Sequence, residues 1–272
     1  MGLGDCVMEK PAFVIGCARS GTSILGEAIA AHPDVKYLFE ASVIWNALQP
    51  IRVDDRLTAA DATPEIAEAA RLALSQAGAE GSGQRLVEKN PKHVLRMPYL
   101  SKSFPDCRFV HLLRDGRDVV ASLMFRNRGD SWGHLKTPGW KELLDRYPQD
   151  NHIRCAHQWR DSVKIARQDA KELSLTRTRY LEAKYEDLLR DPGGTLRLIL
   201  QFLELEPHPQ VDAFLPRIQD ATRGSYHAKR QVRHYVENHT RRVGRHEENL
   251  TEKQLQDVLS VCGDLLKELG YL

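Results

Sequence analysis

Residues 11–40 read PAFVIGCARSGTSILGEAIAAHPDVKYLFE, and this stretch decides the fold. It opens with an apolar run, Ala12 to Ile15, which is typical of a short strand buried on both faces. A tight, glycine-containing turn follows, and then a helical pattern. A turn of this kind directs backbone N–H groups and the positive end of the helix dipole toward one point. The stretch therefore predicts a phosphate- or sulfate-binding loop made by Arg19, Ser20, Gly21, Thr22 and Ser23.

This loop differs from a Walker A motif. That motif has a lysine, followed by serine or threonine, to contact the terminal phosphates and magnesium. Here the chain has Arg19 and Ser20 before Gly21, and no lysine. The alternative is an ordinary strand–helix turn with an incidental Arg19. A second segment of the chain favours the anion-binding interpretation instead.

The second segment, residues 108–126, reads RFVHLLRDGRDVVASLMFR. It predicts another buried strand, with Arg114 at its carboxyl end and a helix after it. Ser122 and Arg126 are four residues apart, so they share one face of that helix. A guanidinium group matches the geometry of phosphate oxygens. We therefore expect Arg114, Ser122 and Arg126 to converge on a second anion.

Two anion sites at the ends of two strands suit a nucleoside that is phosphorylated at both ends. Together the two motifs resemble the sulfotransferases that use 3′-phosphoadenosine-5′-phosphosulfate (PAPS). In that family an RSGT-type loop holds the 5′-phosphosulfate, and an arginine and a serine with the spacing of Arg114 and Ser122 hold the 3′-phosphate. The resemblance runs from Pro11 to the C-terminus, is weakest over 51–83 and 127–150, and is closest to the protein-tyrosine and bacterial branches.

The resemblance implies a single α/β domain with a parallel sheet flanked by helices, related to the P-loop nucleotide kinases. The pattern of apolar segments agrees, because strands that alternate with helices give parallel sheets. We expect strands near 12–15, 35–38, 85–88, 109–113 and 179–185, and helices near 22–29, 42–48, 64–77, 118–128, 151–173, from 192, and 251–269, with another that begins at Pro91.

The resemblance also implies in-line transfer of a sulfuryl group from PAPS to an acceptor hydroxyl. Glu40 is the candidate base, since it lies 21 residues after Arg19 (40 − 19) and protein-tyrosine sulfotransferases have a glutamate at similar spacing. A solvated loop carboxylate is the alternative for Glu40, and a histidine, His93 or His111, is the alternative base. Arg19 is expected to lie over the sulfate. Lys89 resembles the basic residue that the family has near the transferring group, although a strand-end lysine is often only a surface residue.

Two further segments match the nucleotide-binding residues of the family. Tyr185 begins a YEDL segment in which the family tyrosine lies near the adenine; a core tyrosine is the alternative. Residues 241–245, RRVGR, resemble the basic glycine loop that closes over the 3′-phosphate. Arg245 is the first candidate there and Arg242 the second. Relatives often have a tryptophan after the last basic residue, whereas this chain has His246.

Composition limits the remaining possibilities. The chain has 272 residues, enough for one domain, with residues 1–10 as an N-terminal tail and 127–150 as a mobile region on the acceptor side. The net charge of +2 argues against a nucleic-acid partner. Five scattered cysteines favour a reducing compartment and show no metal-ligand spacing. The first residues lack a long apolar run, so we expect no signal peptide or membrane anchor and a cytoplasmic, bacterial enzyme.

Two other functions stay open from the sequence. One is a P-loop kinase or NTPase acting on a small molecule, and the other is a non-catalytic nucleotide-binding protein of the same fold. The acceptor is also open, and a small molecule, a carbohydrate or a tyrosine-bearing acceptor would each supply a hydroxyl. Its choice is expected to depend on the loops at 42–57, 127–150 and 225–236. The oligomeric state is not predicted.

Overall fold

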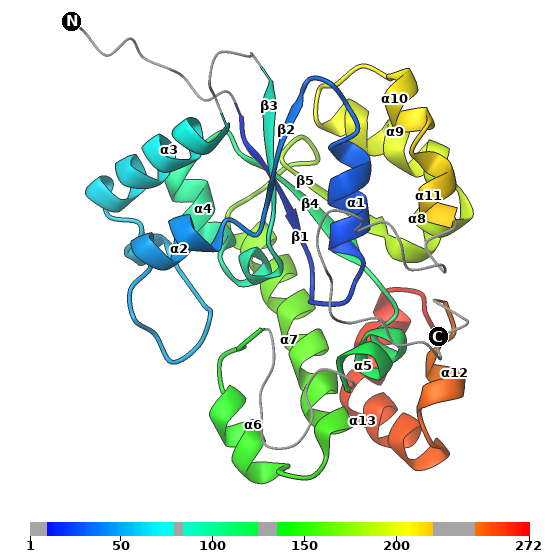
Figure 1. Ribbon diagram of the computed structural model, residues 1–272. Helices are drawn as coiled ribbons and strands as arrows, with labels where there is room; N and C mark the ends of the chain where they lie inside the picture. Colours follow the sequence, from blue (N-terminus) through cyan, green and yellow to red (C-terminus); the bar gives the residue numbers. More distant parts are fainter. Residues whose placement is uncertain (1–9, 79–83, 125–134, 220–242) are drawn as a thin grey trace, which may run out of the picture.

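A computed structural model of the chain describes residues 10–78, 84–124, 135–219 and 243–272. Within these ranges the chain forms one parallel sheet in the order β2-β3-β1-β4-β5 (Figure 1). The expected α/β fold with a parallel sheet flanked by helices is confirmed. The strands are β1 (Ala12–Ile15), β2 (Val35–Phe39), β3 (Arg85–Lys89), β4 (Arg108–Leu113) and β5 (Tyr180–Lys184).

The sheet is buried on both faces, as the apolar run in β1 predicted. Ala12 and Val14 face one layer of helices, Phe13 and Ile15 face the other, and all four are fully buried. The first layer comprises α1 (Thr22–Ile29), α8 (Tyr185–Arg190), α9 (Pro192–Phe202), α10 (Pro209–Asp212) and α11 (Leu215–Gln219). The second comprises α2 (Ser42–Leu48), α3 (Pro64–Gly78), α4 (Met97–Ser103), α7 (Asn151–Glu172) and the 3₁₀ turns η1 (Ala59–Asp61) and η2 (Pro91–Leu95).

A third group of helices packs near the carboxyl ends of β1 and β4. Helices α5 (Gly116–Met124) and α13 (Glu252–Glu268) pack with α7 in a cluster that also holds Cys17 and Ala18 of the predicted loop. The short helix α12 (His246–Asn249) lies beside α5 in Figure 1. The loop after β1 is therefore supported by packing against α5, α7 and α13.

The structure differs from the sequence predictions in several helices. α5 begins at Gly116, two residues before Asp118. The segment after Asn90 is the 3₁₀ turn η2, followed by α4, and the Asn90 side chain caps it by accepting a hydrogen bond from Lys92 N. Region 127–150 contains α6 (Trp140–Arg146), which follows Gly139 in a left-handed conformation. α10 and α11 lie in a stretch for which no separate helix was predicted; Pro209 and the cap formed by His208 start α10.

The order of the strands determines where a ligand would bind. β1 lies between β3 and β4, and all three are parallel, so the loops that follow them meet at one edge of the sheet. In such sheets ligands bind at the carboxyl edge, where the strand order reverses. The loop after β1, Lys89 at the end of β3 and Arg114 after β4 all belong to this edge.

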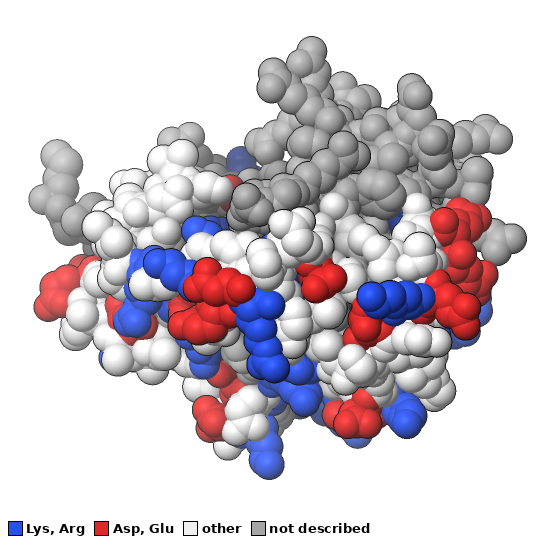
Figure 2. Space-filling model, turned by 90° about the horizontal axis from the view of Figure 1, so that it is seen from below, with Lys and Arg blue, Asp and Glu red and all other residues white. Residues whose placement is uncertain are grey.

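The surface of the molecule agrees with the low net charge. Figure 2 shows basic and acidic side chains interspersed over the face seen from below, outside the area drawn in grey. Among the helices that the structure describes, none combines the length and apolarity needed to cross a membrane.

Candidate functional site

The loop after β1 is held in a conformation that requires glycine at its end. Gly21 has φ of +95°, and a Cβ atom there would lie 2.4 Å from Cδ2 of Tyr185. The Tyr185 ring, only 2% exposed, therefore packs directly against the loop. Arg19 also has a left-handed φ of +76°, a strained conformation that is common at functional sites. The packing of Tyr185 against Gly21 thus fixes the conformation of the loop that leads into α1.

The two predicted anion sites are joined by direct contacts. Arg19 Nε donates to Ser122 Oγ at 3.0 Å, and Arg114 Nη1 donates to the carbonyl oxygen of Arg19 at 2.8 Å. The Arg114 guanidinium also lies 4.6 Å from the centre of the Tyr185 ring. The loop after β1 and the strand–helix turn after β4 thus form one continuous surface.

Arg245 brings a third guanidinium group to this surface. It is 92% buried (8% exposed), and its Nε has no hydrogen-bond partner among the residues that the structure describes. Burial, followed by the positive charges of Arg114 and Arg19, lowers the pKa of Arg245 to about 10. Buried charges are stable only when they are paired. A phosphate group bound here would supply the missing negative charge, so these residues fit a phosphorylated nucleotide.

Glu40 and Lys89 form a direct ion pair near the same edge. Glu40 Oε1 lies 2.5 Å from Lys89 Nζ, and Glu40 N donates to the carbonyl oxygen of Lys89 at 2.8 Å. Lys89 is 1% exposed and its ammonium lies 3.9 Å from the centre of the Phe39 ring. Burial lowers the pKa of Lys89 despite the opposing attraction of Glu40. Lys89 is therefore a buried cation, not a surface lysine.

A buried carboxylate supports this pair. Glu88 Oε1 accepts hydrogen bonds from Ala41 N at 3.1 Å and from Trp45 Nε1 at 3.0 Å, and Oε2 lies 2.5 Å from His93 Nε2. Glu88 thereby anchors the residue after Glu40 and the start of α2. Sequence reasoning missed this role; the signal was an acidic residue within a strand that is otherwise buried.

The two alternative histidines are enclosed in the protein. His93 and His111 are both fully buried. His93 lies edge-on to Phe13 and Trp45, and His111 contacts the Tyr180 hydroxyl. Burial lowers the pKa of His111 to about 4. A general base must come within hydrogen-bond reach of its substrate, and neither ring is exposed to one.

The remaining predicted residues differ in their burial and in whether the structure describes them. Ser20 and Thr22 are buried in the loop, and Ser23 is partly exposed at the start of α1. Arg126 and Arg242 lie outside the described residues.

Among those described, no group of histidine, cysteine, aspartate and glutamate side chains could hold a metal ion.

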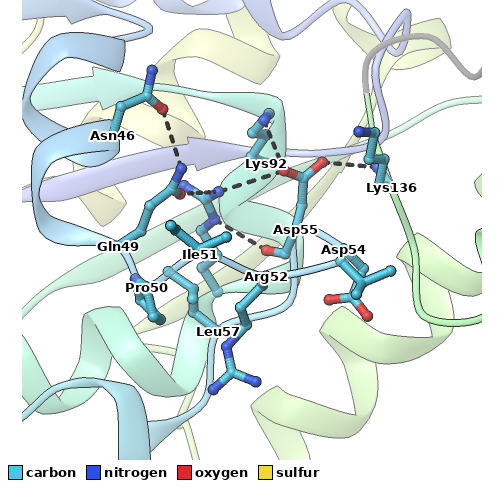
Figure 3. A pocket seen from close by; sticks show the side chains of 12 residues that line it. Asn46, Gln49, Pro50, Ile51, Arg52, Asp54, Asp55, Leu57, Lys92 and Lys136 are labelled. Atoms are coloured by element: carbon cyan, nitrogen blue, oxygen red, sulfur yellow. Dashed lines mark hydrogen bonds and ion pairs between the residues drawn. The ribbon is translucent and has the colours of Figure 1, made fainter.

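A pocket of about 350 Å³ lies on the side of the predicted acceptor loops (Figure 3). Asp55 binds Lys92 Nζ at 2.7 Å and Lys136 N at 2.8 Å, which ties the loop after α2 to the segment before α6. Lys92 is three residues after Lys89, so their Cα atoms are at most ~11 Å apart. Basic residues outnumber acidic ones in its lining, which is Asn46, Gln49, Pro50, Ile51, Arg52, Val53, Asp54, Asp55, Leu57, Lys92, Arg96 and Lys136.

Comparisons of the sequence and of the structure with known proteins both find sulfotransferases. The model of the Sulfotransferase family matches residues 11–210. Protein-tyrosine sulfotransferase of Drosophila melanogaster is 26% identical over 75% of this chain and 39% of its own length. Omega-hydroxy-beta-dihydromenaquinone-9 sulfotransferase Stf3 of Mycobacterium tuberculosis is 30% identical over 49% of this chain and 31% of its own. The chain spans about half or less of these curated relatives.

Solved structures show the same fold. Sulfotransferase STF9 of Mycobacterium avium has a TM-score of 0.58 at 15% identity, covering 97% of this chain and 78% of that one. Mouse sulfotransferase SULT7A1, complexed with 3′-phosphoadenosine 5′-phosphate (PAP), has a TM-score of 0.55 at 15% identity, covering 94% of this chain and 84% of that one.

Gly21→Ala should destabilise the protein. A left-handed alanine costs about 1–2 kcal/mol and overpacking against Tyr185 about 1–3 kcal/mol, so the free energy of unfolding should fall by about 2–5 kcal/mol. Gly263→Ala is the control, because it lies within α13 with nothing within 4 Å of its added Cβ. It should stabilise by up to about 1 kcal/mol. Urea unfolding measures both; a Gly21→Ala protein as stable as the parent would contradict the packing described.

Proposed function

Because the chain belongs to the sulfotransferase family, we propose that it transfers a sulfuryl group from PAPS to the hydroxyl group of an acceptor. The observation that carries the proposal is the meeting of Arg19, Arg114 and Arg245 beside the loop after β1. Positive charge gathered on three segments suits a ligand with phosphate at both ends of a nucleoside.

Each end of the nucleotide has its own set of residues in this proposal. The loop from Arg19 to Ser23 binds the 5′-phosphosulfate, and Arg114, Ser122 and Arg245 bind the 3′-phosphate. Arg126 and Arg242, outside the described residues, remain candidates for the 3′-phosphate. Tyr185 supports the loop through Gly21 and the Arg114 guanidinium, and its predicted place near the adenine stays a prediction.

Sulfuryl transfer requires a base for the acceptor hydroxyl, positive charge beside the oxygens of the moving group, and correct placement of the two substrates. The acceptor oxygen forms a bond to sulfur while the bond from sulfur to the 5′-phosphate oxygen breaks, and PAP leaves. Glu40 takes the proton of the acceptor hydroxyl. Lys89, held 2.5 Å from Glu40, places that carboxylate and offsets the negative charge that develops on the leaving phosphate, together with Arg19.

The two alternative functions have less support. A P-loop kinase would need a lysine in the loop, and the family match is to sulfotransferases. A non-catalytic nucleotide-binding protein would not need the ion pair between the buried Lys89 and the partly exposed Glu40. We also place the reaction in the cytoplasm, since Cys17, Cys107, Cys155 and Cys262 are free and buried.

We further propose that the acceptor enters through the pocket of Figure 3. Its lining comes from two of the three loops expected to choose the acceptor, and its η2 residue Lys92 follows Lys89 closely. The excess of basic side chains suits a hydroxyl acceptor that also carries an anionic group. Small-molecule, carbohydrate and tyrosine-bearing acceptors all fit this description.

Ligand-dependent thermal stability tests the nucleotide site. PAP at one hundred times its dissociation constant should stabilise the folded protein by about 2.7 kcal/mol, without added metal. ATP with magnesium is the comparison. Stabilisation by ATP and magnesium but not by PAP would overturn the proposal and favour a kinase.

Glu40→Gln should lower kcat by about 10²–10⁴-fold, because the amide cannot accept the proton. The dissociation constant for PAP should stay unchanged, since the amide oxygen still accepts a hydrogen bond from Lys89. Glu65→Gln, an exposed change in the first turn of α3, is the matched control. Turnover of Glu40→Gln equal to that of Glu65→Gln would remove Glu40 from the mechanism.

Lys136→Gln should weaken use of an anionic acceptor. Lys136 is exposed, lines the pocket and lies over the Trp140 ring. Lys141 contacts the same ring but does not line the pocket, so Lys141→Gln is the control. With 4-hydroxyphenylacetate the KM should rise about two- to fivefold in Lys136→Gln, as expected for an exposed ion pair. With 4-hydroxyphenylacetamide, which is uncharged, it should not change. Equal effects of both variants would place the acceptor elsewhere.

A further inference from the structure

Asp118 is a fully buried carboxylate that binds a segment distant in the sequence. Its Oδ2 accepts a hydrogen bond from Gly244 N at 2.9 Å. Its Oδ1 accepts one from His246 N at 3.0 Å and lies 2.6 Å from His246 Nδ1. Asp118 belongs to α5, and the residues it holds lie 126 and 128 positions later in the chain.

These bonds hold the residues on both sides of Arg245. Gly244 has a left-handed φ of +73°, which turns the chain just before Arg245. After it, the Asn249 side chain donates to the carbonyl oxygen of Arg245 at 2.7 Å. The backbone of Arg245 is thus fixed from both directions, while its guanidinium Nε has no hydrogen-bond partner among the residues described. These contacts position the backbone of Arg245 through its neighbours Gly244, His246 and Asn249.

The charge of Asp118 suits this arrangement. Burial raises the pKa of Asp118, but the hydrogen bond from His246 and the charge of Arg114 outweigh burial, so the pKa lies below its ordinary value. The carboxylate is therefore ionised, and it lies 3.9 Å from Arg114 Nη2. It offsets part of the positive charge that Arg19, Arg114 and Arg245 bring together.

We propose that Asp118 is a positioning residue: by holding Gly244 and His246 it sets Arg245 against Arg114, and so determines how strongly the site prefers a nucleotide with a 3′-phosphate. The inference rests on the proposed function, because it assigns Arg245 to that phosphate. It adds a residue that touches no ligand, and it separates affinity for the 3′-phosphate from affinity for the rest of the nucleotide.

The test compares two ligands that differ only in the 3′-phosphate, PAP and AMP. Asp118→Asn keeps the size of the side chain but turns one acceptor into an N–H donor facing N–H groups of Gly244 or His246. The preference of the protein for PAP over AMP, measured by calorimetry, should fall at least ~10-fold, the scale of one hydrogen bond to a charged group. The dissociation constant for AMP should change by less than about twofold, within the scatter of distant substitutions.

Asp257→Asn is the matched control. Asp257 accepts a hydrogen bond from His152 Nε2 at 2.9 Å, so it is an aspartate–histidine pair between α13 and α7, outside the proposed nucleotide-binding residues. This variant should bind both ligands as the parent does. His246→Ala, which removes one of the three bonds to Asp118, should lose part of the preference and serves if Asp118→Asn does not fold.

A double-mutant cycle separates positioning from general stability. Arg245→Ala should lose the same preference, and adding Asp118→Asn to it should lower the preference no further. An equal loss of PAP and AMP affinity in Asp118→Asn, or an unchanged preference, would overturn the inference. Failure of the parent protein to bind PAP is a different result, which would overturn the proposed function and the inference with it.

Discussion

Repulsion among like charges is the constraint on which the rest of this structure depends. Arg19, Arg114 and Arg245 come from three distant segments, and burial, followed by the positive charges of Arg114 and Arg19, lowers the pKa of Arg245 to about 10. The fold opposes this repulsion with the carbonyl oxygen of Arg19, the hydroxyl of Ser122 and the buried carboxylate of Asp118. In the proposed function, a bound phosphorylated nucleotide would add further negative charge beside these three groups.

The parts of the site that are local in sequence could be predicted, and the parts that depend on distant contacts could not. The loop from Arg19 to Ser23 followed from the apolar run before it, because a strand, a turn and a helix within 30 residues of sequence fix one another. Asp118 gave no such signal, since its partners lie 126 and 128 residues away. His246, which had made the register of the basic segment uncertain, proves to bond to Asp118. Helix α6 was missed because its start depends on a left-handed Gly139.

Glu40 and Lys89 illustrate the same limit. Each was proposed for its own reason, yet the sheet places them together. Phe39, the last residue of β2, pairs with Lys89 in the β2–β3 register, so Glu40, the residue after β2, lies beside the lysine. The two residues that make this contact are 49 positions apart in the chain. The ion pair, with Glu88 binding the backbone N–H of Ala41 just beyond Glu40, holds the proposed base beside Lys89.

The end of α13 is fastened to the site as well. Lys184 Nζ donates to the carbonyl oxygen of Leu269, and the Tyr271 hydroxyl donates to Glu186, which in turn accepts from Asp115 N. This has a consequence for synthesis on the ribosome. Arg114 and Arg245 are 131 residues apart (245 − 114), so at about 5–20 residues per second they are made roughly 7–26 s apart. During that interval the growing chain has Arg19 and Arg114 without Arg245, and the proposed nucleotide site stays incomplete until the end of α13, which binds Lys184, has been made.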